Sequence, residues 1–306
     1  MQKNIVDYLI ITLKGMAMGA ADVVPGVSGG TIAFISGIYD ELLDSINAVN
    51  FSLLKQIKSS GIKVAWLQMN GNFLLALLLG IGISVFSLAK LLSGLLVTYP
   101  ILVWAFFFGL VLASIFFVGK QISKWSYTAF IALVLGSVLS FMITQLPVAS
   151  SANPAAWYLV LSGALAICAM ILPGISGSFI LVLLGVYQVV LTAVHQREFS
   201  ILVWLALGAV IGLLSFSRIL KYVFLHYKNT TLALLTGFLV GALYKIWPWK
   251  QVLETAEVEG RIIVIKEKSI SPFSFEGDNL FLYALLLALV GFLLIVIFER
   301  WGAKRR

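Results

Sequence analysis

The sequence predicts an all-α polytopic membrane protein made of two inverted repeats, each a broken or re-entrant helical hairpin followed by three transmembrane helices. Of its 306 residues, 61% are hydrophobic and only 11% are charged, and the mean hydropathy is +1.04. A Pro-Gly-x-Ser-Gly motif occurs twice inside apolar sequence. The basic residues between apolar segments gather in alternate loops. Together these observations indicate helices of bilayer length, a duplication and a defined orientation.

Apolar segments fill nearly the whole chain, so we expect one membrane domain over residues 1–306 and no soluble domain. The first segment ends in small residues and could imitate a signal peptide, but the repeat requires it, and we expect it to be retained. The segments lie at about 5–21, 29–46, 73–97, 101–119, 126–146, 156–171, 176–194, 200–224, 231–247 and 280–298.

The second half of the chain repeats the first. Pro25–Gly29 corresponds to Pro173–Gly177 at an offset of 148 residues. Further along, the offset falls to 128, so the first half carries 20 extra residues near 51–72. We expect repeat one at about 1–150 and repeat two at about 151–306.

Loop charges predict the orientation, because Lys and Arg accumulate on the cytoplasmic side. Loops 97–100 and 147–155 contain neither residue. The pattern requires an odd number of crossings in each half, which inverts the halves and leaves both termini cytoplasmic. The cytoplasmic set is Lys3, Lys55, Lys58, Lys63, Lys120, Lys124, Arg218, Lys221, Lys228, Arg300, Lys304, Arg305 and Arg306; the opposite set is Arg197, Lys245, Lys250, Arg261, Lys266 and Lys268.

Inverted repeats interrupted by Gly and Pro at matching positions are typical of secondary transporters. Pro25-Gly26 and Pro173-Gly174 should break the helices, and Ser28 and Ser176 should cap helices running to about Ile46 and Val194. Freed N–H groups and hydroxyls there suit an anion such as phosphate, although simple kinks packed on small residues are an open alternative. The predicted anion-binding residues are Ser28, Gly29, Gly30, Thr31, Ser176, Gly177 and Ser178.

Three charged residues belong to this hypothesis. Asp22 precedes the first motif, and Met170 takes its place in the second. A desolvated carboxyl near a phosphate could carry a proton or hold sodium and so couple transport to an ion gradient; the alternatives are a backbone cap or a pair with Lys14. Lys90 and Arg218 match in the repeat and could collect the anion on opposite sides of the membrane, or simply snorkel to the interface.

The stretches "GAADVVPGVSGGTIAFISGIYDELL" and "ILPGISGSFILVLLGVYQVVL" resemble the bacterial polyprenyl-phosphate translocase family. The similarity extends to "LGIGISVFSLAKLL", "FFFGLVLASI" and "GFLVGALYKIWPW". It implies translocation of undecaprenyl phosphate, the lipid carrier of cell-wall glycan synthesis, from the outer to the inner leaflet of the bacterial plasma membrane.

Two other functions compete with this one. "GVSGG" at Gly26–Gly30 satisfies the G-x-S-x-G pattern of serine hydrolases, but a nucleophilic serine needs a base. His195 and His226 lie at segment ends, Lys14 or Lys90 would have to serve, and the second copy breaks the pattern. We therefore expect no enzymatic activity. The other alternative is ion-coupled transport of a small soluble anion.

The remaining features point to no further ligand. With one cysteine and two histidines, the chain is expected to bind no metal and no cofactor. Its net charge of +8 fits membrane orientation better than nucleic-acid binding. The loop at about 248–279, expected on the external side, includes "EVEGRIIVIKE", whose alternation predicts a β-hairpin, to which we assign no role.

Overall fold

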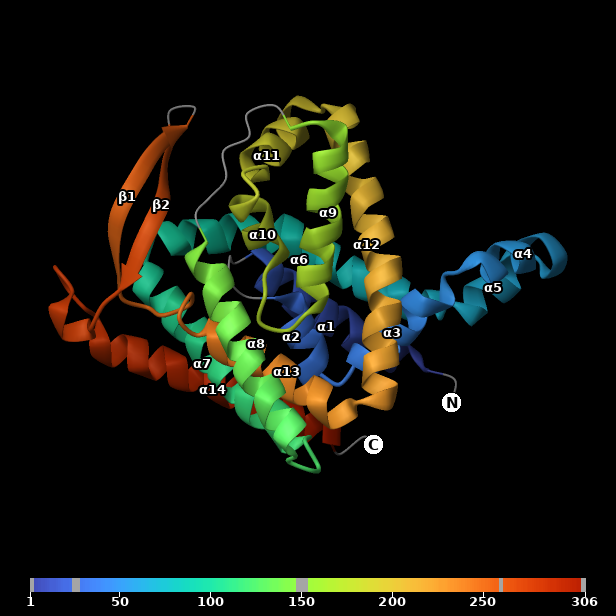
Figure 1. Cartoon of the computed structure of the whole chain (residues 1–306), viewed down its shortest axis with the longest axis horizontal. Coiled ribbons are helices and arrows are strands. Elements are labelled where there is room, and N and C mark those ends of the chain that lie inside the picture. The colour runs from blue at the N-terminus through green and yellow to red at the C-terminus, as the bar shows by residue number, and fades with distance from the viewer. Residues whose placement is uncertain (1–2, 24–27, 147–153, 259–260, 304–306) are drawn as a thin grey trace.

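The computed structural model describes residues 3–23, 28–146, 154–258 and 261–303, and most of them are helical (Figure 1). The first half contains α1 (Ile5–Val23), α2 (Gly29–Ile35), α3 (Tyr39–Ala48), α4 (Phe51–Ser60), α5 (Ile62–Gln68), α6 (Gly71–Thr98), α7 (Pro100–Lys120) and α8 (Tyr127–Gln145). The second contains α9 (Ala156–Ile171), α10 (Gly177–Leu183), α11 (Tyr187–Gln196), α12 (Phe199–His226), α13 (Lys228–Ala242), β1 (Lys250–Val258), β2 (Arg261–Ser269), the 3-10 helix η1 (Pro272–Ser274) and α14 (Phe281–Ala303).

The helices confirm an all-α polytopic membrane protein. Within the described residues, four segments are long and apolar enough to cross a bilayer: Gly71–Leu88, Pro100–Lys120, Tyr127–Gln145 and Phe199–His226. Many of their large apolar side chains are exposed; Phe86 on α6, for example, is 90% exposed. Such surfaces would be costly in water and suit contact with lipid.

The motif helices are shorter than predicted. We expected continuous helices from Ser28 to about Ile46 and from Ser176 to about Val194, and this was wrong. Each is broken in the middle, at Gly37 with φ +73° and at Gly185 with φ +68°. Only glycine adopts this left-handed backbone without strain, and at the second break α10 and α11 meet at a bend of 115°.

The close helix crossings follow the same repeat as the sequence. Gly80 of α6 lies so close to α1 that a Cβ there would collide with the carbonyl oxygen of Thr12. Gly208 of α12 lies against α9 in the same way, facing the carbonyl of Val160. Both partners match at the offsets found in the sequence. These close backbone approaches are the known role of small residues between membrane helices.

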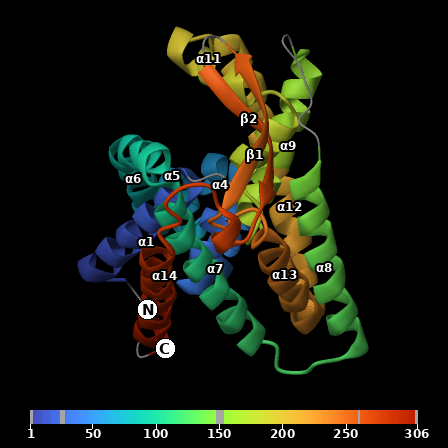
Figure 2. The same ribbon diagram turned by 90° about the vertical axis from the view of Figure 1, so that its left-hand side faces the viewer.

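The remaining long helices pack in exchanged pairs, and each pair combines one helix of the first half with one of the second (Figure 2). Gly109 of α7 lies against Ala288 of α14, and Gly237 of α13 lies against Leu133 of α8. Each contact therefore joins one helix from each half. The halves interlock, which is what a two-fold relation between them would produce, while their orientation in the membrane stays a prediction.

Two additions interrupt this pattern. Helices α4 and α5 fall in the extra 51–72 stretch of the first half and project away from the other helices (Figure 1). In the second half, β1 and β2 form an antiparallel hairpin, which confirms the predicted strands. Trp249, at its base, packs with Ile101 of α7 and Ala284 of α14, so the hairpin is anchored on the helices.

A methyl group at a crossing glycine tests this packing. We expect Gly208→Ala to lower the free energy of unfolding by about 1–3 kcal/mol, because overpacking forces backbones apart. Gly82→Ala is the matched control, since a Cβ at Gly82 meets nothing within 4 Å. Thermal unfolding in detergent should separate the two variants, and equal melting temperatures would contradict the close α9–α12 contact.

Candidate functional site

The described part of motif one (residues 25–31) begins at Ser28, because Pro25 and Gly26 lie outside the described residues. The Gly29 N–H donates a hydrogen bond to Asp22 Oδ1 at 2.7 Å. A Cβ at Gly29 would collide with the same carboxyl group. Asp22 therefore caps the start of α2, as one of the sequence alternatives proposed, and the glycine is needed for its close approach.

Ser28 links motif one to the second half. Its hydroxyl accepts from Gly30 N at 3.1 Å and donates to the carbonyl of Met170 at 2.8 Å. A side chain at Gly30 would collide with the carbonyls of Met170 and Ile171. Because Ser28 is fully buried, these bonds satisfy groups that lipid could not.

Two further bonds join the motifs directly. Gly174 N donates to Thr31 Oγ1 at 3.1 Å, and the Tyr39 hydroxyl donates to the carbonyl of Ile171 at 2.9 Å. Gly174 has φ +89° and follows Pro173, which stands just beyond the end of α9. Proline and glycine follow directly on the end of α9, where the sequence predicted a helix break. The last carbonyls of α9 meet motif one, a contact that the sequence did not predict. We call these bonds and those of Ser28 the inter-motif contact.

Motif two (residues 173–179) differs chemically from motif one. Ser176 and Ser178 share a hydrogen bond of 2.8 Å between their hydroxyls, and Ser176 caps α10 by accepting from Phe179 N. Gly177 lies against the side chain of Met170, where Gly29 lies against Asp22. A carboxylate therefore adjoins motif one where a thioether adjoins motif two.

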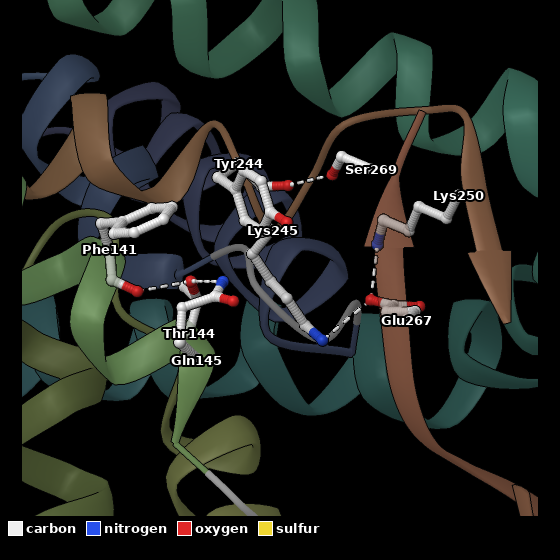
Figure 3. A network of polar contacts seen from close by, with 8 residues as sticks. All are labelled: Phe141, Thr144, Gln145, Tyr244, Lys245, Lys250, Glu267 and Ser269. Atoms are coloured by element: carbon white, nitrogen blue, oxygen red, sulfur yellow. Dashed lines mark hydrogen bonds and ion pairs between the residues drawn. The ribbon is translucent and has the colours of Figure 1, made fainter. Parts of the chain in front are cut away.

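A lysine that the sequence identifies only as a loop charge reaches motif two. Lys245, in the turn after α13, lies with its Nζ 4.9 Å from the Phe179 ring centroid. The same Nζ lies 2.9 Å from Glu267 Oε1 (Figure 3). It borders a void of about 10 Å³, room for one water molecule. Thr144 of α8 and Ser176 also line this void. Its proximity to motif two depends on the fold and had no sequence signal.

Glu267 is shared between two lysines. Lys250 Nζ lies 3.0 Å from the same Oε1 and 4.1 Å from the Trp104 ring centroid of α7. Burial lowers the pKa of Lys250 to about 8, although Glu267 opposes the shift. Burial alone would raise the pKa of Glu267, but Lys250 and Lys245 outweigh it and hold that pKa below its usual value. The carboxylate is therefore ionised at neutral pH.

An apolar cavity of about 200 Å³ lies beside motif one. Lys14 borders it and donates to the carbonyl of Ser36, at the end of α2, at 2.6 Å. Apolar side chains make up most of the rest of its wall, including Ala17, Ile32, Leu91, Phe107 and Leu294. Such a cavity suits a hydrocarbon better than an ion.

Arg218, one of the two basic residues paired in the repeat, takes no part in these contacts. Arg218 is exposed on α12, and among the described residues it makes no hydrogen bond or ion pair. Lys90 falls in α6, next to cavity-lining Leu91, but its side chain lies outside the described part of the structure. The structure therefore does not bring Arg218 to the motifs.

Fold and site define a helical membrane protein whose two broken-helix motifs meet in its buried interior. The chain belongs to the undecaprenyl phosphate translocase-like family, whose model matches residues 18–263. It is 47% identical over 303 residues to a polyprenyl-phosphate transporter of Vibrio cholerae, covering 97% of this chain and 98% of that protein. A polyprenyl-phosphate transporter of Staphylococcus aureus is 33% identical over 254 residues, 77% of this chain and 85% of that one. No solved structure matches.

The low pKa of Lys250 predicts a titration within reach of ordinary buffers. Because burial disfavours the ammonium, Lys250 should lose its charge at a pH of about 8, which removes the cation from the Trp104 ring. Tryptophan fluorescence should therefore change with that midpoint. Lys250→Arg, which keeps its charge at any accessible pH, should abolish the transition; a transition that persists in Lys250→Arg would assign it to another group.

Proposed function

We propose that this protein moves undecaprenyl phosphate from the outer to the inner leaflet of the bacterial plasma membrane, where the carrier is reused in cell-wall glycan synthesis. The observation that carries the proposal is the 47% identity to a polyprenyl-phosphate transporter over 97% of the chain. Both termini are cytoplasmic and the two halves are inverted in this proposal. The matched helix crossings and exchanged helices support the two-fold relation that inversion requires.

The substrate combines an anion with a long apolar tail, and the site offers a complement to each. Backbone N–H groups and hydroxyls of both motifs suit the phosphate, and the apolar cavity beside Lys14 suits the first part of the tail. In the described conformation the Gly29 and Gly30 N–H groups and the Ser28 hydroxyl are paired within the protein. Phosphate must therefore displace internal acceptors. The proposed headgroup residues are Ser28, Gly29, Gly30, Thr31, Ser176, Gly177 and Ser178.

Through Asp22, the displacement of internal acceptors by phosphate can depend on a proton or a sodium ion. Its carboxylate accepts the Gly29 N–H, a donor that phosphate would need, and it would repel the incoming anion in a medium of low dielectric constant. A proton or sodium ion on Asp22 removes the repulsion and releases the N–H. Entry of phosphate is thereby linked to uptake of the cation.

A serine hydrolase fits the geometry poorly. The Ser28 hydroxyl donates to the carbonyl of Met170, which cannot accept a proton as a general base does. Lys14 is directed to the carbonyl of Ser36 instead. Transport without covalent chemistry accounts for both arrangements, so we propose no enzymatic activity.

Transport of undecaprenyl phosphate between leaflets of proteoliposomes, with and without proton or sodium gradients, tests the function. Asp22→Asn keeps the shape but cannot titrate, so it should lower gradient-driven transport at least about tenfold, equivalent to ~1.4 kcal/mol. Asp44→Asn, at an exposed acid paired with Lys221, is the matched control and should transport normally. Uptake of free phosphate alone would favour the soluble-anion alternative, and normal ion dependence in Asp22→Asn would leave Asp22 as a cap.

Lys90 and Arg218 are proposed to collect headgroups at opposite boundaries before they enter. An anionic headgroup gains ~1 kcal/mol from each nearby basic residue, so Lys90→Gln and Arg218→Gln should each slow transport about fivefold, with the loss greatest at low salt. Lys120→Gln, at the end of α7, is the control. Wild-type rates in both variants would show that these residues only anchor their helices.

A further inference from the structure

We propose that Lys245 binds the phosphate group of the substrate at motif two, and that Glu267 of β2 is the internal carboxylate that occupies Lys245 when phosphate is absent. This inference rests on the proposed function and adds the residue that makes motif two the primary anion site. It also gives the β1–β2 hairpin a role.

The position of Lys245 is the first argument. Its side chain reaches from the end of α13 to Glu267 of the hairpin (Figure 3). Its Nζ also lies 4.9 Å from the ring centroid of Phe179 in motif two. Hydroxyl-bearing Thr144 and Ser176 border the same void. A cation and hydroxyl groups converging on one space are the groups that recognise a phosphate monoester.

Charge balance is the second argument. Glu267 is the only carboxylate that forms an ion pair with Lys245 or Lys250 in the described part of the chain, so the cluster has one positive charge in excess. The three side chains are only 22%, 10% and 26% exposed for Lys245, Lys250 and Glu267. An excess charge that is largely removed from water favours binding of an anion.

The charged side chains beside the two motifs have opposite signs, and this difference is the third argument. Motif one has the Asp22 carboxylate on its glycine N–H, whereas motif two has Met170 at the matching position and Lys245 nearby. At the repeat offset of 128, position 245 matches Phe117, so the first half has no corresponding lysine. An anion is thus repelled at one motif and attracted at the other.

Binding requires a local rearrangement. A void of about 10 Å³ holds a water molecule but not a phosphate. Lysine has three donor hydrogens on a flexible chain, so Lys245 can turn from Glu267 toward a phosphate. Lys250 keeps Glu267 paired while this happens, and the Trp104 ring holds Lys250 in place. The hairpin then remains attached through Lys250.

The test measures affinity for undecaprenyl phosphate, neutral undecaprenol and inorganic phosphate with the full chain in nanodiscs. Lys245→Gln should weaken undecaprenyl phosphate binding about tenfold or more and leave undecaprenol binding unchanged. Lys268→Gln is the matched control, because it removes an exposed lysine beside Glu267 on the same strand, and it should change affinity less than about threefold.

The direction in which Glu267→Gln changes the affinity for undecaprenyl phosphate distinguishes a binding role from a structural one. If Glu267 competes with phosphate, Glu267→Gln strengthens undecaprenyl phosphate binding, and adding Lys245→Gln abolishes the gain. A purely structural ion pair would make both single variants weaker. Lys245→Arg keeps the charge and should retain affinity, which controls for a Lys245→Gln variant that fails to fold.

The outcomes distinguish this inference from the proposed function. Wild-type binding of undecaprenyl phosphate that Lys245→Gln leaves intact overturns the inference alone. Binding of inorganic phosphate but not of the lipid, lost in Lys245→Gln, supports the anion site and overturns the lipid as its source. Parallel losses in Lys245→Gln and Glu267→Gln overturn the competition.

Discussion

The structure depends on one constraint: a helix broken in a lipid environment must have its freed backbone groups satisfied by protein. The inter-motif contact meets it. Ser28 and Thr31 from motif one bond to the carbonyl of Met170 and the N–H of Gly174 from the other half, and Tyr39 reaches the next carbonyl. Because each motif supplies partners for the other, neither could lie in hydrocarbon alone. The two halves are therefore mutually dependent at their centre.

The same contact explains why the surrounding helices cross so closely. Motif helices of only seven residues, α2 and α10, bury little surface themselves, so longer helices must hold them. Gly80 and Gly208 bring α6 and α12 onto α1 and α9, and exchanged pairs enclose the centre. The hydrophobic effect does not hold helices together within a membrane. Dispersion forces between closely packed backbones supply the stabilisation instead. Small residues at these crossings are thus a condition for the site.

Symmetry in the backbone coexists with asymmetry in charge. A perfectly symmetric pair of sites would bind an anion equally well on both sides. A coupling proton or sodium ion would then have no site at which it could favour one side. Here a carboxylate caps one motif and a lysine–glutamate pair adjoins the other. In both places an internal carboxylate occupies a donor that phosphate could use. In the proposed function, substrate binding is therefore an exchange of anions, which avoids exposing an unpaired buried donor.

The sequence by itself determined the class of protein, the duplication, the hairpin and the helix-breaking role of Pro173-Gly174, because hydropathy, repetition and backbone preferences are local properties. It also suggested that Asp22 could cap a turn. It did not locate the breaks at Gly37 and Gly185, since a single glycine in the interior of an apolar segment also fits a continuous helix. Only the tertiary structure placed Lys245 beside motif two and opposite Glu267. That pairing depends on how β2 packs against the end of α13, a contact between distant parts of the chain that no local pattern encodes.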